Sequence, residues 1–272
     1  MGAEVLMLLA IAVPFVVAVL VGMSDGKPNQ RETVTLVGAC VTFGIVLNLL
    51  PGAMESVRTS IELLEFVAGL TIRFELEPLG MMFALIASFL WIVSSIYSIG
   101  YMRGKNEGHQ TRFFVCFAIA IGSALMVALA GNMLTLFIGY EVLSLSTYPL
   151  VAHHQNAEAR KGGRIYLGYL LTTSIGLLLL GMIWTWHLTG SLEFRPGGIL
   201  EGKVEEATAG ILLILYMFGI GKAALMPFHR WLPAAMVAPT PVSALLHAVA
   251  VVKAGVFSVL KVIIYIFGVD FL

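Results

Sequence analysis

Residues 216–262 read YMFGIGKAALMPFHRWLPAAMVAPTPVSALLHAVAVVKAGVFSVLKV, and they are the most informative part of the chain. It holds two apolar helical runs, each with a lysine near its middle, Lys222 and Lys253. A charge at bilayer depth costs about 2.5 to 3.5 kcal/mol on insertion scales, so it is kept where it faces protein or water and usually has a use. Together with Glu141 in another apolar run, the two lysines indicate a path for an ion. The segment between the runs is interrupted by Pro227, Pro233, Pro239 and Pro241.

The composition places the chain in the membrane. Hydrophobic residues make up 59% of the sequence and charged residues 12%, and the mean hydropathy is +0.94, which is outside the range of soluble domains. The formal net charge is zero, so nothing suggests a nucleic-acid partner. Cys40 and Cys116 lie in apolar runs without C-x-x-C spacing, and we expect neither a disulfide framework nor a metal site, nor any bound cofactor.

Crossing the hydrocarbon core takes about 20 helical residues. We therefore predict an all-α integral membrane protein with about eight transmembrane helices, the seventh of them broken at its prolines. Residues 70–78, LTIRFELEP, alternate apolar and charged side chains, which suits a short strand or an amphipathic loop at the interface. Gly131 and Asn132 leave room only for a very tight turn, so the helices on either side should be antiparallel neighbours. The eight spans are residues 4–22, 33–50, 79–101, 113–130, 132–152, 165–188, 207–228 and 241–267.

Basic residues predict the orientation in the membrane. Cytoplasmic loops carry an excess of Lys and Arg. One set of alternate loops collects Lys27, Arg31, Arg103, Lys105, Arg112, Arg160, Lys161, Arg164 and Arg230. The other set has Arg58, Arg73, Arg195, Lys203 and Lys261, and we expect Lys261 to snorkel from its helix end to the interface. We predict a multi-pass protein of the cell membrane with both termini outside the cytoplasm.

Glu141 and Lys222 are the leading candidates for chemistry, because both lie near mid-membrane. Burial disfavours the ammonium form of lysine, whereas a nearby carboxylate favours it. A Glu–Lys pair whose separation changes would therefore switch the protonation of Lys222. The alternative for Glu141 is a protonated or hydroxyl-paired carboxylate that only locks helix packing.

Two further candidates lie on the last span. His247 and Lys253 are six residues apart, about 9 Å along a helix axis and about 120° around it, so at most one of them can face Lys222. A lone histidine on an apolar helix is often a core residue, but its titration near neutral pH also suits a relay. By contrast, His153, His154 and His187 fall at helix ends, where we expect solvated interfacial side chains rather than a metal site.

The broken segment after Lys222 has two interpretations. Backbone without helical hydrogen bonds must be buried in protein or line a wet cavity at membrane depth. The segment would then border a hydrated gap beside Lys222. Alternatively, residues 233–241 are only the loop between two helices.

Three stretches resemble a known family. They are LEPLGMMFALIASFLWIVSSIYSIGYM at 76–102, FIGYEVLSLSTYPLV at 137–151 and GKAALMPFHRWLPAAMVAPTPVSALLHAVAVVKAGVF at 221–257. These are similar to the antiporter-like proton-pumping subunits of respiratory complex I, membrane-bound hydrogenases and Mrp cation/proton antiporters. The last stretch is the most specific. Tyr140 stands where a tryptophan is common in that family.

The resemblance implies roles for residues and for the chain as a whole. Lys222 would be the proton carrier, Glu141 would set its proton affinity, and His247 and Lys253 would take relay positions. Residues 1–78 would form two helices and an interfacial loop, residues 79–112 a third helix and a cytoplasmic loop, and residues 113–272 a five-helix proton-channel bundle. Family members usually contain a second, inverted bundle, which this sequence lacks, so a complete path would need another chain. Either the module is split between polypeptides or this sequence is a fragment of a longer one.

The resulting hypothesis is a subunit that forms half of a proton, or cation and proton, translocation module in a larger membrane complex. No covalent chemistry is expected in this chain, although the complex could be a proton-translocating oxidoreductase or an Mrp-type antiporter; H⁺ and possibly Na⁺ would be transported. One alternative is a structural membrane subunit. Another is a haem-carrying cytochrome, which would need paired histidines at depth, where only His247 lies.

Overall fold

The computed structural model describes residues 2–54, 58–67 and 70–269, and within these residues the chain is a helical bundle with one small hairpin. Seven of its helices are long and apolar enough to cross a membrane. They are α1 (Ala3–Met23), α2 (Pro28–Ala53), α3 (Pro78–Gly104), α4 (Gln110–Ala128), α5 (Met133–Val151), the continuous helix Ala157–Thr189 and the continuous helix Thr240–Phe267.

Both continuous helices contain π-helical turns. The first consists of α6 (Ala157–Thr173) and α7 (Leu179–Thr189), joined by a π-helical turn at Ser174–Leu178. The second consists of α10 (Thr240–Ala244) and α11 (Val251–Lys261), with π-helical turns at Leu245–Val249 and Val262–Phe267.

Unlike the other predicted spans, residues 207–228 do not form a continuous helix. This stretch is helical only in α8 (Glu206–Gly219), whose 14 residues are too few to cross the bilayer alone. The chain then continues as a single 3-10 turn at Gly221–Ala223 and, after a second such turn, reaches the short helix α9 (Trp231–Ala234). The described residues thus form seven candidate spans, and the stretch predicted as a broken span stops being helical after Gly219, ahead of the first of its prolines, Pro227.

Of the two alternatives for residues 70–78, a short strand or an amphipathic loop, the structure shows the strand. Strand β2 (Leu70–Glu75) pairs antiparallel with β1 (Ser60–Val67). Two backbone hydrogen bonds fasten β2 to the turn between α4 and α5, from Glu75 N to Leu129 O at 2.8 Å and from Gly131 N to Arg73 O at 2.8 Å. The turn is as tight as predicted, and α4 and α5 pack as antiparallel neighbours.

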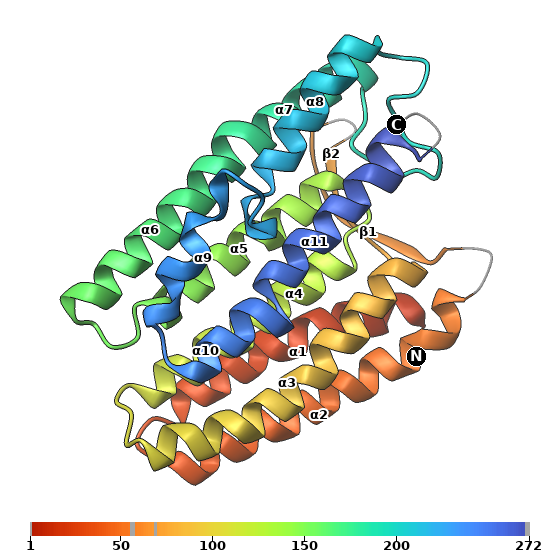
Figure 1. Cartoon of the computed structure of the whole chain (residues 1–272). Helices are drawn as coiled ribbons and strands as arrows, with labels where there is room; N and C mark the ends of the chain where they lie inside the picture. Colours follow the sequence, from red (N-terminus) through yellow and green to blue (C-terminus); the bar gives the residue numbers. More distant parts are fainter. Residues whose placement is uncertain (1, 55–57, 68–69, 270–272) are drawn as a thin grey trace.

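The helices run roughly parallel to one long axis, and the hairpin covers one end (Figure 1). Helix α1 begins and α11 ends toward that same end (Figure 1). Helices α1, α2 and α3 form one side of the bundle, whereas α6, α7 and α8 form the opposite side. Helices α4, α5 and α11 lie between these sides, and the core of the molecule is built around them.

The outer surface of the spans is apolar. Exposed side chains include Val19 on α1, Phe89 and Ile96 on α3, Ile183 on α7 and Ile214 on α8, with exposed fractions between 50% and 63%. Apolar faces of this size are a liability in water. They are the surface that a lipid bilayer requires.

Candidate functional site

The break after α8 lies in the middle of the bundle and is fixed by glycines. A Cβ atom on Gly255 of α11 would lie 2.3 Å from the backbone nitrogen of Ala223, and one on Gly221 would lie 2.2 Å from Oγ1 of Thr173. Two elements can approach so closely only where the side chain is a hydrogen atom. In addition, the indole Nε1 of Trp231 donates to the carbonyl of Gly221 at 2.9 Å. The 3-10 turn is therefore held between α6 and α11 in one position.

This turn presents Lys222 to helix α5. The side chain is completely buried. Its ammonium donates to the backbone carbonyl of Tyr140 at 2.7 Å and to Oγ of Ser144 at 2.5 Å, and it lies 3.1 Å from the centroid of the Tyr140 ring. The phenol of Tyr140 in turn accepts the backbone N–H of Lys222 at 2.9 Å. Neutral oxygens and a π-face thus surround the ammonium.

Glu141 is the next residue on α5. Its Oε1 atom is buried and accepts no hydrogen bond from any residue that the structure describes. Within the described residues, no ion pair joins Glu141 to Lys222. Lys222 instead donates to the carbonyl of Tyr140, the residue before Glu141, and to Ser144.

The other two candidates do not join this site. His247 lies in the π-helical turn at Leu245–Val249, is half-buried, and has a buried Nε2 atom without a hydrogen-bond partner among the described residues. Lys253 is exposed on the surface of α11. The π-helical turn and the irregular backbone at Ala250, with φ −125° and ψ −64°, separate the two residues, so the ideal-helix spacing used to relate them does not apply.

Lys261 differs from its prediction. It does not snorkel, because only 1% of its side chain is exposed. The ammonium forms an ion pair with Oε1 of Glu77, which is equally buried, and donates to the carbonyl of Ala130 at 2.8 Å. The ring of Phe194 lies 4.3 Å from the nitrogen. The structure thus contains a buried Glu–Lys ion pair at the hairpin end of the bundle.

Sequence reasoning missed this pair for a physical reason. Glu77 stands just before Pro78, where α3 begins, and a carboxylate there suits a helix N-terminus exposed to water. Lys261 stands near the end of a predicted span, where snorkelling is the usual outcome. Both are buried by tertiary contacts, which for Lys261 include Ala130 in the turn between α4 and α5 and Phe194 in the loop after α7.

A polar network surrounds the pair. Arg58 Nη1 lies 3.5 Å from Glu77 Oε2 and 3.0 Å from Glu75 Oε1. Arg73 forms ion pairs with two carboxylates: its Nη2 lies 3.2 Å from Glu75 Oε2, and its Nη1 lies 3.0 Å from Glu193 Oε2. A cavity of about 380 Å³ opens beside these side chains, between the hairpin and the loop that follows α7. The network fastens the hairpin to the bundle.

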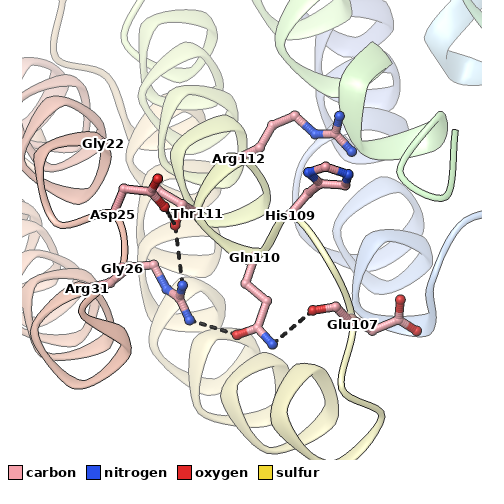
Figure 2. A pocket seen from close by; sticks show the side chains of 9 residues that line it. All are labelled: Gly22, Asp25, Gly26, Arg31, Glu107, His109, Gln110, Thr111 and Arg112. Atoms are coloured by element: carbon pink, nitrogen blue, oxygen red, sulfur yellow. Dashed lines mark hydrogen bonds between the residues drawn. The ribbon is translucent and has the colours of Figure 1, made fainter.

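A larger cavity, of about 610 Å³, opens at the opposite end, between the loops that precede α2 and α4. Figure 2 shows Arg31 at its centre, donating to Gln110 at 2.7 Å and to Thr111 at 3.3 Å. Arg112 also lines this cavity and donates to the backbone carbonyl of His153 at 2.8 Å.

His153 itself contradicts the expectation of a solvated histidine, because only 2% of the residue is exposed. It lies just beyond the end of α5, with its ring edge-on to that of Phe113 at 6.1 Å. Burial, and secondarily the positive charge of Arg112, lowers the pKa of the imidazole to about 4. His153 is therefore neutral at pH 7.

Comparisons with known proteins agree with this architecture. A family model described as NADH:quinone oxidoreductase/Mrp antiporter, transmembrane, matches residues 130–270, and one described as the N-terminus of complex I chain 5 matches residues 67–114. A protein of Rhizobium meliloti described as a probable K⁺/H⁺ antiporter component is 34% identical over 71% of this chain. NADH-ubiquinone oxidoreductase chain 5 of Allomyces macrogynus is 33% identical over 69% of it.

Two solved structures share the fold. The Mrp complex of Dietzia superposes on 93% of this chain with a TM-score of 0.79 and 26% identity. The membrane-bound sulfane sulfur reductase, an archaeal respiratory membrane complex, superposes on 93% with a TM-score of 0.80 and 20% identity, which shows a common fold alone. The matched part of this chain corresponds to 27% and 52% of those two chains.

The relatives are much longer than this chain. It spans 19% of the length of the Rhizobium relative and 29% of that of the Allomyces relative. The family models nevertheless cover most of the chain from the hairpin to the last span, including the break at Lys222. The resemblance found in the sequence is confirmed: the chain belongs to the NADH:quinone oxidoreductase/Mrp antiporter family of membrane proteins.

Proposed function

We propose that this chain forms one half of a proton, or cation and proton, translocation module within a larger membrane complex. The observation that carries the proposal is the complete burial of Lys222 at a break in a membrane helix, beside Glu141. An ionisable group at this depth is retained where it serves a path for ions. The relatives, which include a complex I chain and a probable K⁺/H⁺ antiporter component, support the same class of activity.

The surroundings of Lys222 suit a group that gains and loses a proton. Its hydrogen-bond partners are a carbonyl and a hydroxyl oxygen, which can accept from either an ammonium or an amine. The negative charge of Glu141 favours the ammonium, and burial favours the amine. A small movement of Glu141 relative to Lys222 would therefore shift the balance. In this mechanism Glu141 sets the proton affinity of Lys222, which the 3-10 turn holds in place.

His247 and Lys253 have separate places in this proposal. His247, half-buried on the π-helical turn, would receive the proton beyond Lys222. Lys253 points out of this chain at mid-span, where lipid would leave its charge unsolvated. We assign its face of α11 to a partner chain that supplies the second half-channel.

The same proposal extends to the membrane orientation and to the domains. The hairpin end, with both termini, would lie outside the cytoplasm, because the opposite end carries the larger number of basic residues. Residues 1–78 and 79–112 would pack beside a five-helix channel bundle formed by residues 113–272. Both redox energy and an opposing ion gradient are compatible with such a module.

The test uses the native complex in sealed vesicles with a pH-sensitive dye. Lys222→Ala removes the proton carrier and Glu141→Gln removes the charge that sets its proton affinity, so each should reduce ion-driven or redox-driven acidification by about a hundredfold or more. Assembly is checked by blue native electrophoresis. Wild-type pumping by either variant in a fully assembled complex would leave a structural role as the better account.

A further inference from the structure

Buried hydroxyl groups follow helix α5 from Lys222 toward the end that carries His153. Oγ of Ser144 accepts a hydrogen bond from the ammonium of Lys222 at 2.5 Å. Thr147, one turn further along, lies 2.6 Å from the phenol of Tyr166 on α6, and either oxygen can be the donor. All three side chains are completely buried.

Most other buried hydroxyls in the described helices do something simpler. Thr35, Thr42, Ser88, Ser98 and Ser258 each bond to the carbonyl four residues earlier in their own helix. That bond satisfies a hydroxyl locally and needs no partner from another helix.

Thr147 makes such local bonds as well, to Leu143 O at 2.6 Å and to Ser144 O at 3.1 Å. It has one hydrogen to donate, so its bond to Tyr166 reverses direction according to where that hydrogen points. Reversible donors of this kind are what a proton relay requires.

The neighbourhood holds Tyr166 in place. Its ring packs edge-on against Trp231 at 5.4 Å, and the indole of Trp231 donates to the carbonyl of Gly221, next to Lys222. The hydroxyls and the lysine are therefore parts of one packed unit.

We propose that Ser144, Thr147 and Tyr166 form a proton relay between Lys222 and the end of the bundle where α5 terminates at His153. This inference rests on the proposed function of Lys222. Side chains one turn apart on a helix are separated by about 5 to 6 Å at Cβ, a distance that one water molecule bridges. The relay directs the proton along α5, toward the side on which the cavity lined by Arg112 opens.

Each step conserves protons and electrons. As the Lys222 ammonium transfers a proton to Ser144 Oγ, the hydroxyl proton of Ser144 passes to the bridging water. That water protonates Thr147 Oγ1, whose own proton passes to the Tyr166 oxygen, and the phenol proton leaves to water on the far side. Each hydroxyl ends with one hydrogen and Lys222 is left as the neutral amine. The reverse sequence loads Lys222.

The structure offers a matched control. Tyr216 on α8 donates to Thr185 on α7 at 3.0 Å, and both side chains are completely buried. This pair has the same chemistry as Tyr166 and Thr147. It lies near the hairpin end of the bundle, away from α5 and outside the relay.

The experiment measures proton transport by the native complex in sealed vesicles. Thr147→Val and Tyr166→Phe, which preserve shape, should each slow transport by about ten- to a hundredfold. Thr147→Ser keeps the hydroxyl and should retain most of the rate, as should the controls Thr185→Val and Tyr216→Phe. Because the groups act in series, the double variant Thr147→Val/Tyr166→Phe should be no slower than the slower single variant.

A solvent isotope effect separates the relay from a packing role. Transport by Tyr166→Phe in D₂O should slow by a larger factor than transport by the wild type, since proton transfer becomes rate-limiting. An unchanged rate and isotope effect in Thr147→Val and Tyr166→Phe, with Lys222→Ala inactive, would overturn the relay and leave the proposed function intact. Wild-type transport by Lys222→Ala would overturn the proposed function itself.

Discussion

The Nζ atom of Lys222 lies 2.5 Å from Oγ of Ser144, so the only side-chain acceptor of this ammonium among the described residues comes from α5. Ser144→Ala removes an acceptor from a completely buried donor, which should lower the free energy of unfolding by about 1.5 to 3 kcal/mol. Denaturation of the purified protein in detergent measures the change. Ser146 is the control, because among the described residues its hydroxyl bonds only to Leu143 O. If Ser146→Ala lowers the free energy of unfolding as much as Ser144→Ala does, the hydrogen bond to Lys222 adds no stability beyond that of a local hydroxyl bond.

Gly255 should not tolerate a methyl group. In Gly255→Ala the new Cβ would lie 2.3 Å from Ala223 N and 2.4 Å from the carbonyl carbon of Lys222, so the 3-10 turn must move. We expect a loss of about 1 to 3 kcal/mol in stability, typical of overpacking, together with impaired transport. Gly210 on α8 has open space at its Cβ position, and Gly210→Ala should be neutral or stabilising. Equal behaviour of the two variants would contradict the close packing.

The Glu77–Lys261 pair should stabilise the hairpin end strongly. Glu77→Gln leaves the ammonium of Lys261 buried without its counter-ion, which typically costs about 3 to 5 kcal/mol. Thermal unfolding of the protein in detergent, followed by circular dichroism, provides the measurement. Glu62, on the same hairpin, is exposed and lies 3.9 Å from Arg73, so Glu62→Gln should change stability by less than about 1 kcal/mol. A mild effect of Glu77→Gln would mean that the pair is solvated.

His153 should make the protein sensitive to acid. Its pKa is lowered from 6.5 to about 4 by burial, so the unfolded chain binds a proton that the folded chain excludes. The free energy of unfolding should therefore fall as the pH drops from about 6.5 to about 4, and this contribution is absent above that window. In His153→Asn the slope of stability against pH between these values should be shallower. An unchanged slope would show that the imidazole is accessible in the folded protein.

Lys253 should matter to the complex and not to the fold. It is exposed on α11, and the structure gives it no ion pair within the described residues, so Lys253→Met should leave the unfolding midpoint of the isolated chain unchanged. In the native complex the same variant should reduce proton transport by about tenfold or more, if a partner chain receives protons at this face. Normal transport by Lys253→Met would remove Lys253 from the path.

Several features could be predicted from sequence because they depend on local pattern. Apolar runs located the spans and alternation in LTIRFELEP located β2. The prolines indicated an interrupted segment, but they did not indicate that α8 ends earlier, at Gly219. Glu141 and Lys222 could be named because a charge inside an apolar run is conspicuous. Their proximity, the outward direction of Lys253 and the burial of His153 depend on tertiary packing.

Two features had no usable local signal. The Glu77–Lys261 pair joins residues at the ends of two spans, each of which looks interfacial by itself. The π-helical turn at Leu245–Val249 has more residues per turn than an α-helix, so it changes the angle around the helix axis between His247 and Lys253. The apolar sequence around it gives no sign of this turn. The sequence also does not show that the hydroxyl of Thr147 contacts another helix, because a buried threonine usually bonds to a carbonyl of its own helix.

The most direct test of the central claim is proton transport by Lys222→Arg in the assembled native complex. Arginine preserves the positive charge and can still donate to Tyr140 O and Ser144 Oγ, but its guanidinium does not release a proton at accessible pH. If Lys222 carries the proton, the variant should assemble normally and transport at a rate about a hundredfold or more below that of the wild type. Wild-type transport by the assembled Lys222→Arg complex would contradict the account.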